Sequence, residues 1–306
     1  MVMKPAKKLI PFFFTILISL YLAPTAQTFT APSSYQPLDV RNGSGLYKQQ
    51  LTDGNEAYLQ VIDMRKMQID QLIGEVDDLG LGQGKYYKGE GGYYSPFFKM
   101  KLFELVTEQY KQLYGKAVFS IINCSFFEQY KDSTQLSFPI KLNGKVITGG
   151  SSPYGPIGHP ISPIYRTIRL KALVWDDKQA YITDYDPATG ANLNDPGVQN
   201  AIVSYRYSDH PAKVLGKNQA NRYHVIGTLD FDGELGDELL SIVTVNKATL
   251  DSAADLLRKL GVKGDIMTID GGSSTYLFNS RMGNIMLPQS ANLPHYLGFR
   301  TRGKTQ

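Results

Sequence analysis

The sequence predicts an α+β or α/β fold in which helices pack on a mixed β-sheet. Short β-branched or aliphatic runs that each end on a polar residue are typical of buried strands. Longer segments with apolar residues at helical spacing lie between and before these runs. The chain has 306 residues, of which 42% are hydrophobic and 20% charged, so it is long enough to bury a full core.

The first 26 residues differ from the rest of the chain. Lys4, Lys7 and Lys8 precede the uncharged run LIPFFFTILISLYLA, a pattern typical of a secretory signal. A membrane-spanning helix needs about 20 apolar residues, and this run is shorter. Ala26 offers a cleavage position, but Pro24 stands where a small residue is preferred, so an uncleaved membrane anchor is the alternative. Either way we expect an exported protein: periplasmic, secreted or attached to the envelope.

Charge and cysteine content exclude several classes. Without residues 1–26 the formal charge falls from +4 to +1, because three lysines and no acids are lost. A nucleic-acid partner would require a concentrated basic face, and the remaining chain has no run of lysines and arginines, so no such partner is expected. Cys124 is the only cysteine, which excludes an intramolecular disulfide. Its apolar context favours a buried, inert thiol.

Composition predicts one domain, residues 55–306, preceded by a linker at residues 27–54. The segment QTFTAPSSYQPLDVRNGSG is rich in Ser, Thr, Pro and Gly, as linkers are. Residues 80–95, GLGQGKYYKGEGGYYS, carry six glycines and four tyrosines. This stretch indicates a long surface loop or, alternatively, a lid whose tyrosines stack on a sugar ring.

A first helix is predicted within MKLFELVTEQYKQLYG. Its apolar residues recur at helical spacing and Gly115 ends it; they are Leu102, Val106, Tyr110 and Leu113.

A second helix is predicted within KATLDSAADLLRKLG. Thr249 is the expected N-cap and Gly261 the stop. The apolar face consists of Leu250, Ala253, Ala254 and Leu257.

Three predicted strands end on polar side chains. AVFSIIN ends at Asn123, LLSIVTVN at Asn246 and DIMTID at Asp270. The second helix connects the last two strands, so residues 238–270 read as a βαβ unit with parallel strands. Ligands of open α/β sheets bind at the carboxyl edge of the strands. We therefore expect Asn123, Asn246 and Asp270, together with His224, to line one cleft.

The loop after Asp270 is suited to an anionic ligand such as a phosphate. Gly271 and Gly272 allow backbone N–H groups to approach a ligand without an intervening Cβ. Ser273, Ser274 and the following threonine add hydroxyl donors.

Several named motifs are absent. The loop lacks the Gly-Lys-Ser or Gly-Lys-Thr of a P-loop, and TYLFNSRMGNIML after it predicts a hairpin instead of the helix of a dinucleotide site. No glycine follows Ser273 as in a nucleophile elbow. The acidic LDFDGELGDE lacks EF-hand spacing, and Asp232-Gly233 in it predicts a hairpin turn.

The four histidines do not predict a zinc site. His159 and His210 precede prolines and His295 follows one, whereas His224 opens an apolar strand next to Arg222. No two histidines have ligand spacing such as H-x-x-x-H. The sequence requires no cofactor and is compatible with a divalent cation.

Four segments resemble, in the same order, the motifs of the phosphodiester glycosidase family, over residues 55–300. They are INCSFF, IGTLDFDGEL, VTVNKATLDSAADLLRKLG and TIDGGSST. The family includes the catalytic domain of the N-acetylglucosamine phosphodiester uncovering enzyme and bacterial relatives associated with exopolysaccharide.

The chain departs from the usual family motifs at several positions. Cys124 and Ser125 replace the glycines of Asn-Gly-Gly-Phe-Phe, and Ser273 replaces the third glycine of Asp-Gly-Gly-Gly-Ser. Tyr223 stands at the arginine of Arg-Thr-Ala-Ile-Gly, and Arg222 matches only after a shift of one residue.

The resemblance implies a hydrolase that acts on a sugar phosphodiester or a related cell-envelope or exopolysaccharide glycan. It implies catalytic roles for Asp270 as general base, nucleophile or metal ligand, for His224 as proton donor, and for Asn123. The residues implied to bind phosphate or substrate are Arg222, Asn246, Gly271, Gly272, Ser273 and Ser274.

Two alternatives remain open: a saccharide-binding or envelope protein that keeps the fold without turnover, and a hydrolase of a different bond. The sequence leaves the sugar, the anomer and the oligomeric state open.

Overall fold

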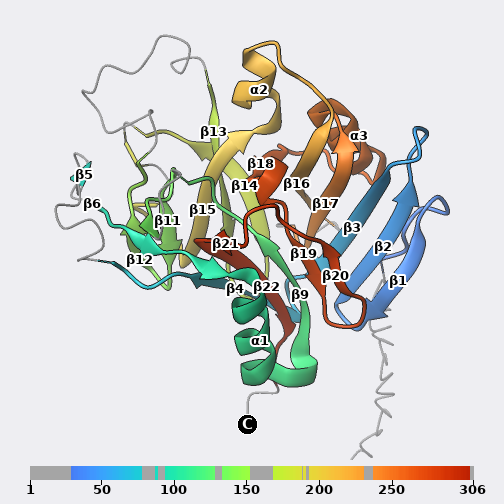
Figure 1. The fold of residues 1–306 in the computed structure, drawn as a ribbon, viewed down its shortest axis with the longest axis horizontal. Helices are drawn as coiled ribbons and strands as arrows, with labels where there is room; N and C mark the ends of the chain where they lie inside the picture. The colour runs from blue at the N-terminus through green and yellow to red at the C-terminus, as the bar shows by residue number, and fades with distance from the viewer. Residues whose placement is uncertain are drawn as a thin grey trace, which may run out of the picture.

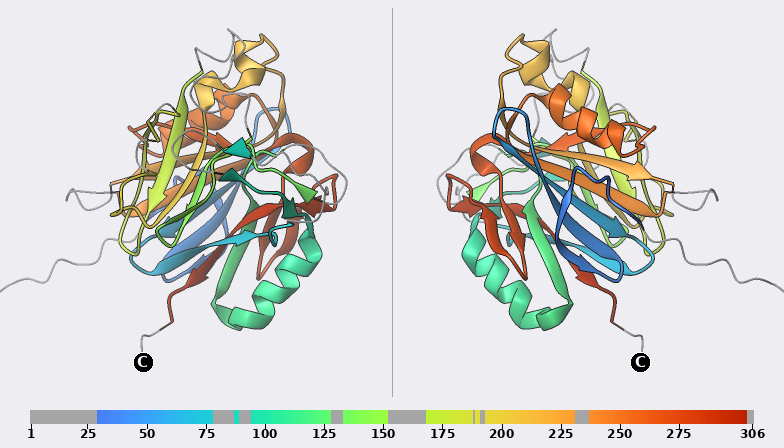
Figure 2. Two further views of the ribbon diagram at one scale, coloured as in Figure 1. Left: turned by 90° about the vertical axis from the view of Figure 1, so that its left-hand side faces the viewer. Right: turned by 90° about the vertical axis from the view of Figure 1, so that its right-hand side faces the viewer.

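Two β-sheets face each other across a hydrophobic core in the computed structural model, and one helix covers the outer face of each sheet (Figure 1, Figure 2). The structure describes residues 29–77, 87–88, 94–127, 133–151, 168–187, 189–190, 193–230 and 237–303.

The larger sheet has 11 strands within the described residues, and its neighbouring strands pair antiparallel. Its main path runs in the order β1 (Gln36–Arg41), β2 (Ser44–Gln50), β3 (Glu56–Asp63), β17 (Leu239–Ala248), β16 (Asn221–Leu229), β18 (Met267–Ile269), β15 (Asn200–Arg206), β11 (Ile140–Leu142) and β12 (Lys145–Thr148). β13 (Leu170–Trp175) pairs with β15 and with β14 (Ala180–Tyr185).

The smaller sheet has five strands among the described residues. Their order is β20 (Gly283–Met286), β19 (Leu277–Asn279), β9 (Val118–Asn123), β22 (His295–Thr301) and β4 (Met67–Ile73). Two-residue strands form three further pairs: β5 (Tyr87–Lys88) with β6 (Tyr94–Ser95), β7 (Phe98–Lys99) with β10 (Ser133–Thr134), and β8 (Lys101–Leu102) with β21 (Asn292–Leu293). The fold is therefore dominated by strands and is consistent with the α+β class.

The core between the sheets follows from the two-residue period of the strands. In β3, Leu59 and Val61 pack with the helix on the outer face, whereas Tyr58 and Ile62 belong to the cluster between the sheets. Successive side chains of a strand point to opposite faces, so β3 contributes to both layers. The inner cluster also takes residues from β9, β16, β18 and β22.

The predicted βαβ unit is present, with one strand between its two strands. β17 leads into α3 (Leu250–Lys259), which leads to β18. Both strands pair antiparallel with β16, so they run parallel to each other on its two sides. Thr249 caps the helix as expected, because its hydroxyl oxygen accepts a hydrogen bond from the Ser252 N–H at 3.1 Å.

The helix that covers the smaller sheet is α1 (Phe103–Tyr114), which ends at Gly115 as predicted. Its buried face differs in part from the expected stripe. Val106 and Tyr110 are buried, but Leu102 and Leu113 are 43% and 74% exposed. The buried face starts at Phe103, one residue later than predicted, and continues at i+3, i+4 and i+7.

The linker expected over residues 27–54 is shorter than predicted. Residues 36–50 contain β1 and β2, which extend the larger sheet beyond β3. Leu46 is completely buried in the inner core and Tyr47 packs in the cluster under α3. The Ser, Pro and Gly content of this segment indicated a linker, but Gly43 (φ +94°) forms the tight connection between the two strands.

Other predicted features fall partly outside the described residues. The leader at 1–26, His159, the Asp232-Gly233 turn and most of the Gly/Tyr-rich stretch at 80–95 belong to this group. β16, which ends before these residues, and β17, which begins after them, pair antiparallel. None of the helices in the described part of the chain has the length and apolar character to cross a membrane.

Truncating the buried face of α3 tests its packing on the larger sheet. Leu257 is completely buried among residues of the outer cluster. We expect Leu257→Ala to lower the free energy of unfolding by about 2–5 kcal/mol, because the substitution leaves a cavity. Asp255→Ala changes an exposed position of the same helix and is the control. Equal effects of both substitutions in urea denaturation would contradict this packing.

Candidate active site

The two sheets are joined at their ends by backbone hydrogen bonds of Cys124. This residue directly follows β9 of the smaller sheet. Its N–H donates to the carbonyl oxygen of His295 at 3.0 Å, and its carbonyl oxygen accepts from the Asp270 N–H at 2.8 Å. Because Asp270 follows β18 of the larger sheet and His295 begins β22 of the smaller one, both residues lie beside the end of β9.

Asn123 holds both ends of the loop that passes from β18 to β19. Its Nδ2 donates to the carbonyl oxygen of Asp270 at 2.8 Å, and its Oδ1 accepts from the Tyr276 N–H at 2.8 Å. The same Oδ1 lies 2.9 Å from Nε2 of His224. Asn123, His224 and Tyr276 are all buried. One amide therefore fixes the shape of the loop through three hydrogen bonds.

His224 is held in one tautomer by these contacts. Oδ1 of Asn123 can only accept, so Nε2 of His224 carries the proton and Nδ1 accepts from the hydroxyl of Thr244 at 2.8 Å. Burial lowers the pKa of His224 to about 3, and the ring is neutral at pH 7. The family resemblance implied that His224 donates a proton to a leaving oxygen. Both of its nitrogens are engaged inside the protein, so the ring orients Asn123 instead.

Asp270 carries a carboxyl group in an environment unfavourable to its ionised form. The residue is 9% exposed, and burial raises the pKa of its carboxyl to about 7. Hydrogen bonds from the Ser274 hydroxyl and the Gly271 N–H lower the pKa but do not offset burial. Near neutral pH the carboxyl is therefore present in both the protonated and the ionised form, as proton transfer in either direction requires.

The structure explains why each of the two residues after Asp270 is a glycine. A Cβ on Gly271 would lie 2.8 Å from the carbonyl oxygen of Arg222, so only glycine allows this approach. Gly272 has φ +60°, which disfavours other residues, and begins the short 3₁₀ turn η4 (Gly272–Ser274). Ser273 on this turn is exposed.

The remaining predicted residues lie at different distances from Asp270. Arg222 is partly exposed on β16, and its Nη1 donates to the carbonyl oxygen of Leu287 at 2.8 Å. Asn246 lies two strands away from β18, roughly 10 Å at the usual strand spacing. Its Oδ1 accepts from the Glu56 N–H at 2.9 Å and so closes the end of β3. The structure connects Asn123, His224 and Asp270 directly, whereas Asn246 is engaged elsewhere.

A second polar pair at the junction was not identified from the sequence. Oγ of Ser125 lies 2.8 Å from Nδ1 of His295, and both residues are buried. Ser125 could be noticed as a departure from the family motif, but nothing in the sequence connects it with a histidine 170 positions later. Cys124 is buried as expected, and burial raises the pKa of its thiol.

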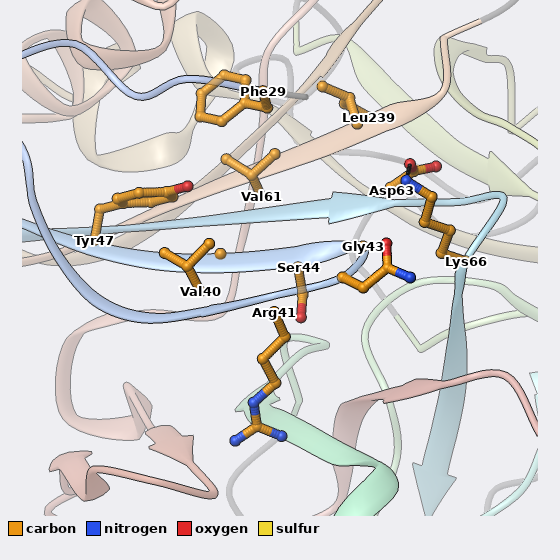
Figure 3. A pocket seen from close by; sticks show the side chains of 12 residues that line it. Phe29, Val40, Arg41, Gly43, Ser44, Tyr47, Val61, Asp63, Lys66 and Leu239 are labelled. Atoms are coloured by element: carbon orange, nitrogen blue, oxygen red, sulfur yellow. Dashed lines mark ion pairs between the residues drawn. The ribbon is translucent and has the colours of Figure 1, made fainter. Parts of the chain in front are cut away.

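Within the described residues, no three or more His, Cys, Asp or Glu side chains are grouped to hold a metal ion. A cavity of about 130 Å³ lies elsewhere, beside the β1–β2 connection (Figure 3). Phe29, Tyr47 and Val61 line the cavity, and so does Asp63, the last residue of β3. Glu56, which contacts Asn246, is the first residue of this strand. The cavity therefore lies at the other end of β3 and is separate from the junction.

Neither a family model nor a curated protein matches the chain. Among solved structures, the chain is similar to a hypothetical protein from Synechocystis, with 12% identity and a TM-score of 0.45 over 89% of this chain and 64% of the other. It thus spans less than two thirds of that protein. It is also similar to the zebrafish N-acetylglucosamine-1-phosphodiester alpha-N-acetylglucosaminidase catalytic domain auto-inhibited by pro-peptide, with 9% identity and a TM-score of 0.47 over 90% of this chain and 86% of that one.

Asn123, at the end of β9, and Asn246, two residues before the end of β17, allow a matched test of the junction. We expect Asn123→Ala to lower the free energy of unfolding by at least about 3 kcal/mol, because three buried backbone or ring groups lose their partner. Asn246→Ala removes one hydrogen bond at a partly exposed site and is expected to cost about 1 kcal/mol. Chemical denaturation of both variants measures the difference, and equal losses would show that Asn123 has no special role.

The raised pKa of Asp270 predicts that the stability difference between the wild type and Asp270→Asn depends on pH. Between about pH 4 and pH 7 the folded chain retains a proton on Asp270 that the unfolded chain has released. The contribution of this proton to the free energy of unfolding is therefore fully present at low pH and is lost as the pH rises to about 7. The stability of Asp270→Asn relative to the wild type should therefore rise by up to about 4 kcal/mol across this range. Comparing the two proteins cancels the titration of the buried histidines, which both contain. A difference that stays constant from pH 4 to pH 8 would refute the shifted pKa.

Proposed function

We propose that the protein is a hydrolase of a sugar phosphodiester or a related cell-envelope glycan, with Asp270 as its proton-transfer group. The observation that carries this proposal is the buried carboxyl of Asp270 at the junction of the two sheets. Asn123 holds the backbone carbonyl of this residue, and groups of the following turn donate to the carboxyl. The sequence resemblance to the phosphodiester glycosidase motifs supplies the substrate class.

A purely structural role explains this carboxyl poorly. The Ser274 hydroxyl and the Gly271 N–H both donate to the side chain of Asp270, and the oxygen of an asparagine amide would accept the same hydrogen bonds. An asparagine would also avoid the cost of burying an ionisable group. Perturbed carboxyls of this kind concentrate at functional sites. We therefore assign Asp270 a chemical role.

The groups around Asp270 suit an anionic substrate. The N–H groups of Gly272 and Ser273 are at the start of a 3₁₀ turn, where they have no acceptor within the turn itself. Arg222 uses Nη1 for Leu287, and a guanidinium has five N–H donors in all. We assign the phosphate to these amides and to Arg222. Ser274 is assigned to the carboxyl of Asp270, and Asn246 is left out of the proposed site.

Asp270 then acts as acid and base in turn. In the protonated form it donates to the oxygen that leaves the substrate, and in the ionised form it accepts a proton from the attacking water. Asn123, His224 and Thr244 keep the loop in place and do not themselves transfer protons. The lysines and the apolar run of residues 1–26 support an exported protein whose substrate lies outside the cytoplasm.

Substituting the carboxyl by an amide tests the proposal. On a nucleotide-linked or aryl sugar phosphodiester we expect Asp270→Asn to reduce turnover by about 100-fold or more, since a lost general acid or base has this effect. Asp255→Asn, which changes an exposed carboxyl of α3, is the control for one lost charge. Circular dichroism of each variant shows whether the fold is kept.

Two outcomes would contradict the proposal. A fully active Asp270→Asn variant would leave the carboxyl without a chemical role. A wild-type protein that binds the substrate without turnover would be a saccharide-binding protein instead. Gly272→Ala is unsuitable for this test, because φ +60° would strain an alanine whether or not a ligand is present.

A further inference from the structure

A serine and a histidine from opposite halves of the chain are in contact at the junction. Oγ of Ser125 and Nδ1 of His295 are 2.8 Å apart, within the range for a nucleophile and its base. Ser125 is 5% exposed and His295 1% exposed. The site proposed above does not include this pair.

The other nitrogen of His295 has no structural use. Nε2 is buried and has no hydrogen-bond partner in the part of the chain that the structure describes. Leaving a buried polar atom without a partner destabilises the fold, and an apolar side chain at this position would avoid that loss. Burial lowers the pKa of His295 to about 3, so the ring is neutral at pH 7 and Nδ1 is free of a proton to accept a hydrogen bond from the Ser125 hydroxyl. The negative charge of a bound phosphate would raise its basicity.

The pair lies at the same junction as Asp270. Cys124 is bonded through its N–H to His295 and through its carbonyl oxygen to the Asp270 N–H. The hydroxyl of Ser125, the next residue, is 3.9 Å from Sγ of Cys124. The carboxylate of Asp270 acts on the same thiol, whose pKa it helps to raise. Serine, histidine and carboxyl are thus gathered around one residue.

We propose that Ser125 is the nucleophile and His295 its base in the proposed reaction, and that Ser125 takes the phosphoryl group of the substrate. This inference rests on the proposed function and adds to it the bond that breaks, between phosphorus and the sugar oxygen. Glycosidases that cleave at the anomeric carbon commonly use two carboxyl groups, and at this junction the described residues supply one, Asp270. A serine hydroxyl with a histidine base is suited to phosphorus.

The proton and electron balance closes over two steps. Oγ of Ser125 forms a bond to phosphorus as Nδ1 of His295 accepts its proton, and the sugar oxygen leaves with the proton of the neutral Asp270 carboxyl. Water then attacks phosphorus and gives a proton to the Asp270 carboxylate. The bond between phosphorus and Oγ breaks, and Oγ regains its proton from His295. The products are the free sugar and a phosphate monoester, with no oxidant, reductant or further reactant.

Hydrolysis of a sugar 1-(methyl phosphate) by the full-length protein in ¹⁸O-labelled water tests this step without any substitution. Cleavage between phosphorus and the sugar oxygen places one ¹⁸O in the methyl phosphate, which mass spectrometry detects. Unlabelled methyl phosphate would mean cleavage at carbon and would overturn the inference, while the proposed hydrolase function would stand. Absence of turnover by the wild type would overturn both.

Variants identify the nucleophile. We expect Ser125→Ala and His295→Gln each to lower turnover by about 100-fold or more, and the double variant to be little worse than either, because the two residues act as a unit. Acid quenching during turnover should trap a phosphoryl group on the wild-type peptide that contains Ser125, and none on Ser125→Ala. Ser241→Ala, at another buried serine whose hydroxyl is unpartnered among the described residues, is the matched control and should keep full activity. A Ser125→Ala variant that is folded and as active as Ser241→Ala would reduce the pair to a structural contact.

Discussion

The backbone of Cys124 is the connection on which the candidate site depends. One peptide unit on each side of this residue bonds to a different sheet, through Asp270 in one direction and His295 in the other. The apolar side chains between the sheets fix distance but little orientation, because hydrophobic contact is not directional. Side-chain hydrogen bonds such as Gln71 to Lys141 and Asn279 to Asp39 link the sheets elsewhere. Hydrogen bonds are directional. The junction therefore sets the angle at which the ends of β9, β18 and β22 come together.

The polar groups at this junction form two sets: a network that is fully hydrogen-bonded, and two groups that burial leaves in an unfavourable state. Thr244, His224 and Asn123 form a continuous chain of hydrogen bonds that ends on the backbone of the loop. Buried polar networks that are fully satisfied give rigidity and a unique structure. The carboxyl of Asp270 and Nε2 of His295 differ, since burial disfavours the charged form of one and leaves the other without a partner among the described residues. A rigid network next to two groups in unfavourable environments is the arrangement expected of a preorganised site.

Local patterns in the sequence predicted the elements of this fold better than their side-chain partners. The cap at Thr249 and the apolar runs that end at Asn123 and Asp270 are short-range signals, and the structure contains the corresponding helix and strands. The position of Asn246 was harder to predict. A βαβ pattern gives the direction of its two strands but not whether a third strand lies between them, and β16 does lie there. Pairs such as Ser125 and His295 depend on the register between distant strands, which no local pattern encodes.

The position of the loop after Asp270 relative to β16 explains why this loop contains glycine. Gly271 approaches the backbone of β16 so closely that a side chain would collide with it, and this approach brings the loop up against the strand that carries Arg222 and His224. Glycine is therefore required by packing before any ligand is considered. A carboxyl group is not required in this way, because an amide would fit the same hydrogen bonds. The proposed chemistry of the loop consequently rests on Asp270, and its glycines are evidence for the fold, not for the substrate.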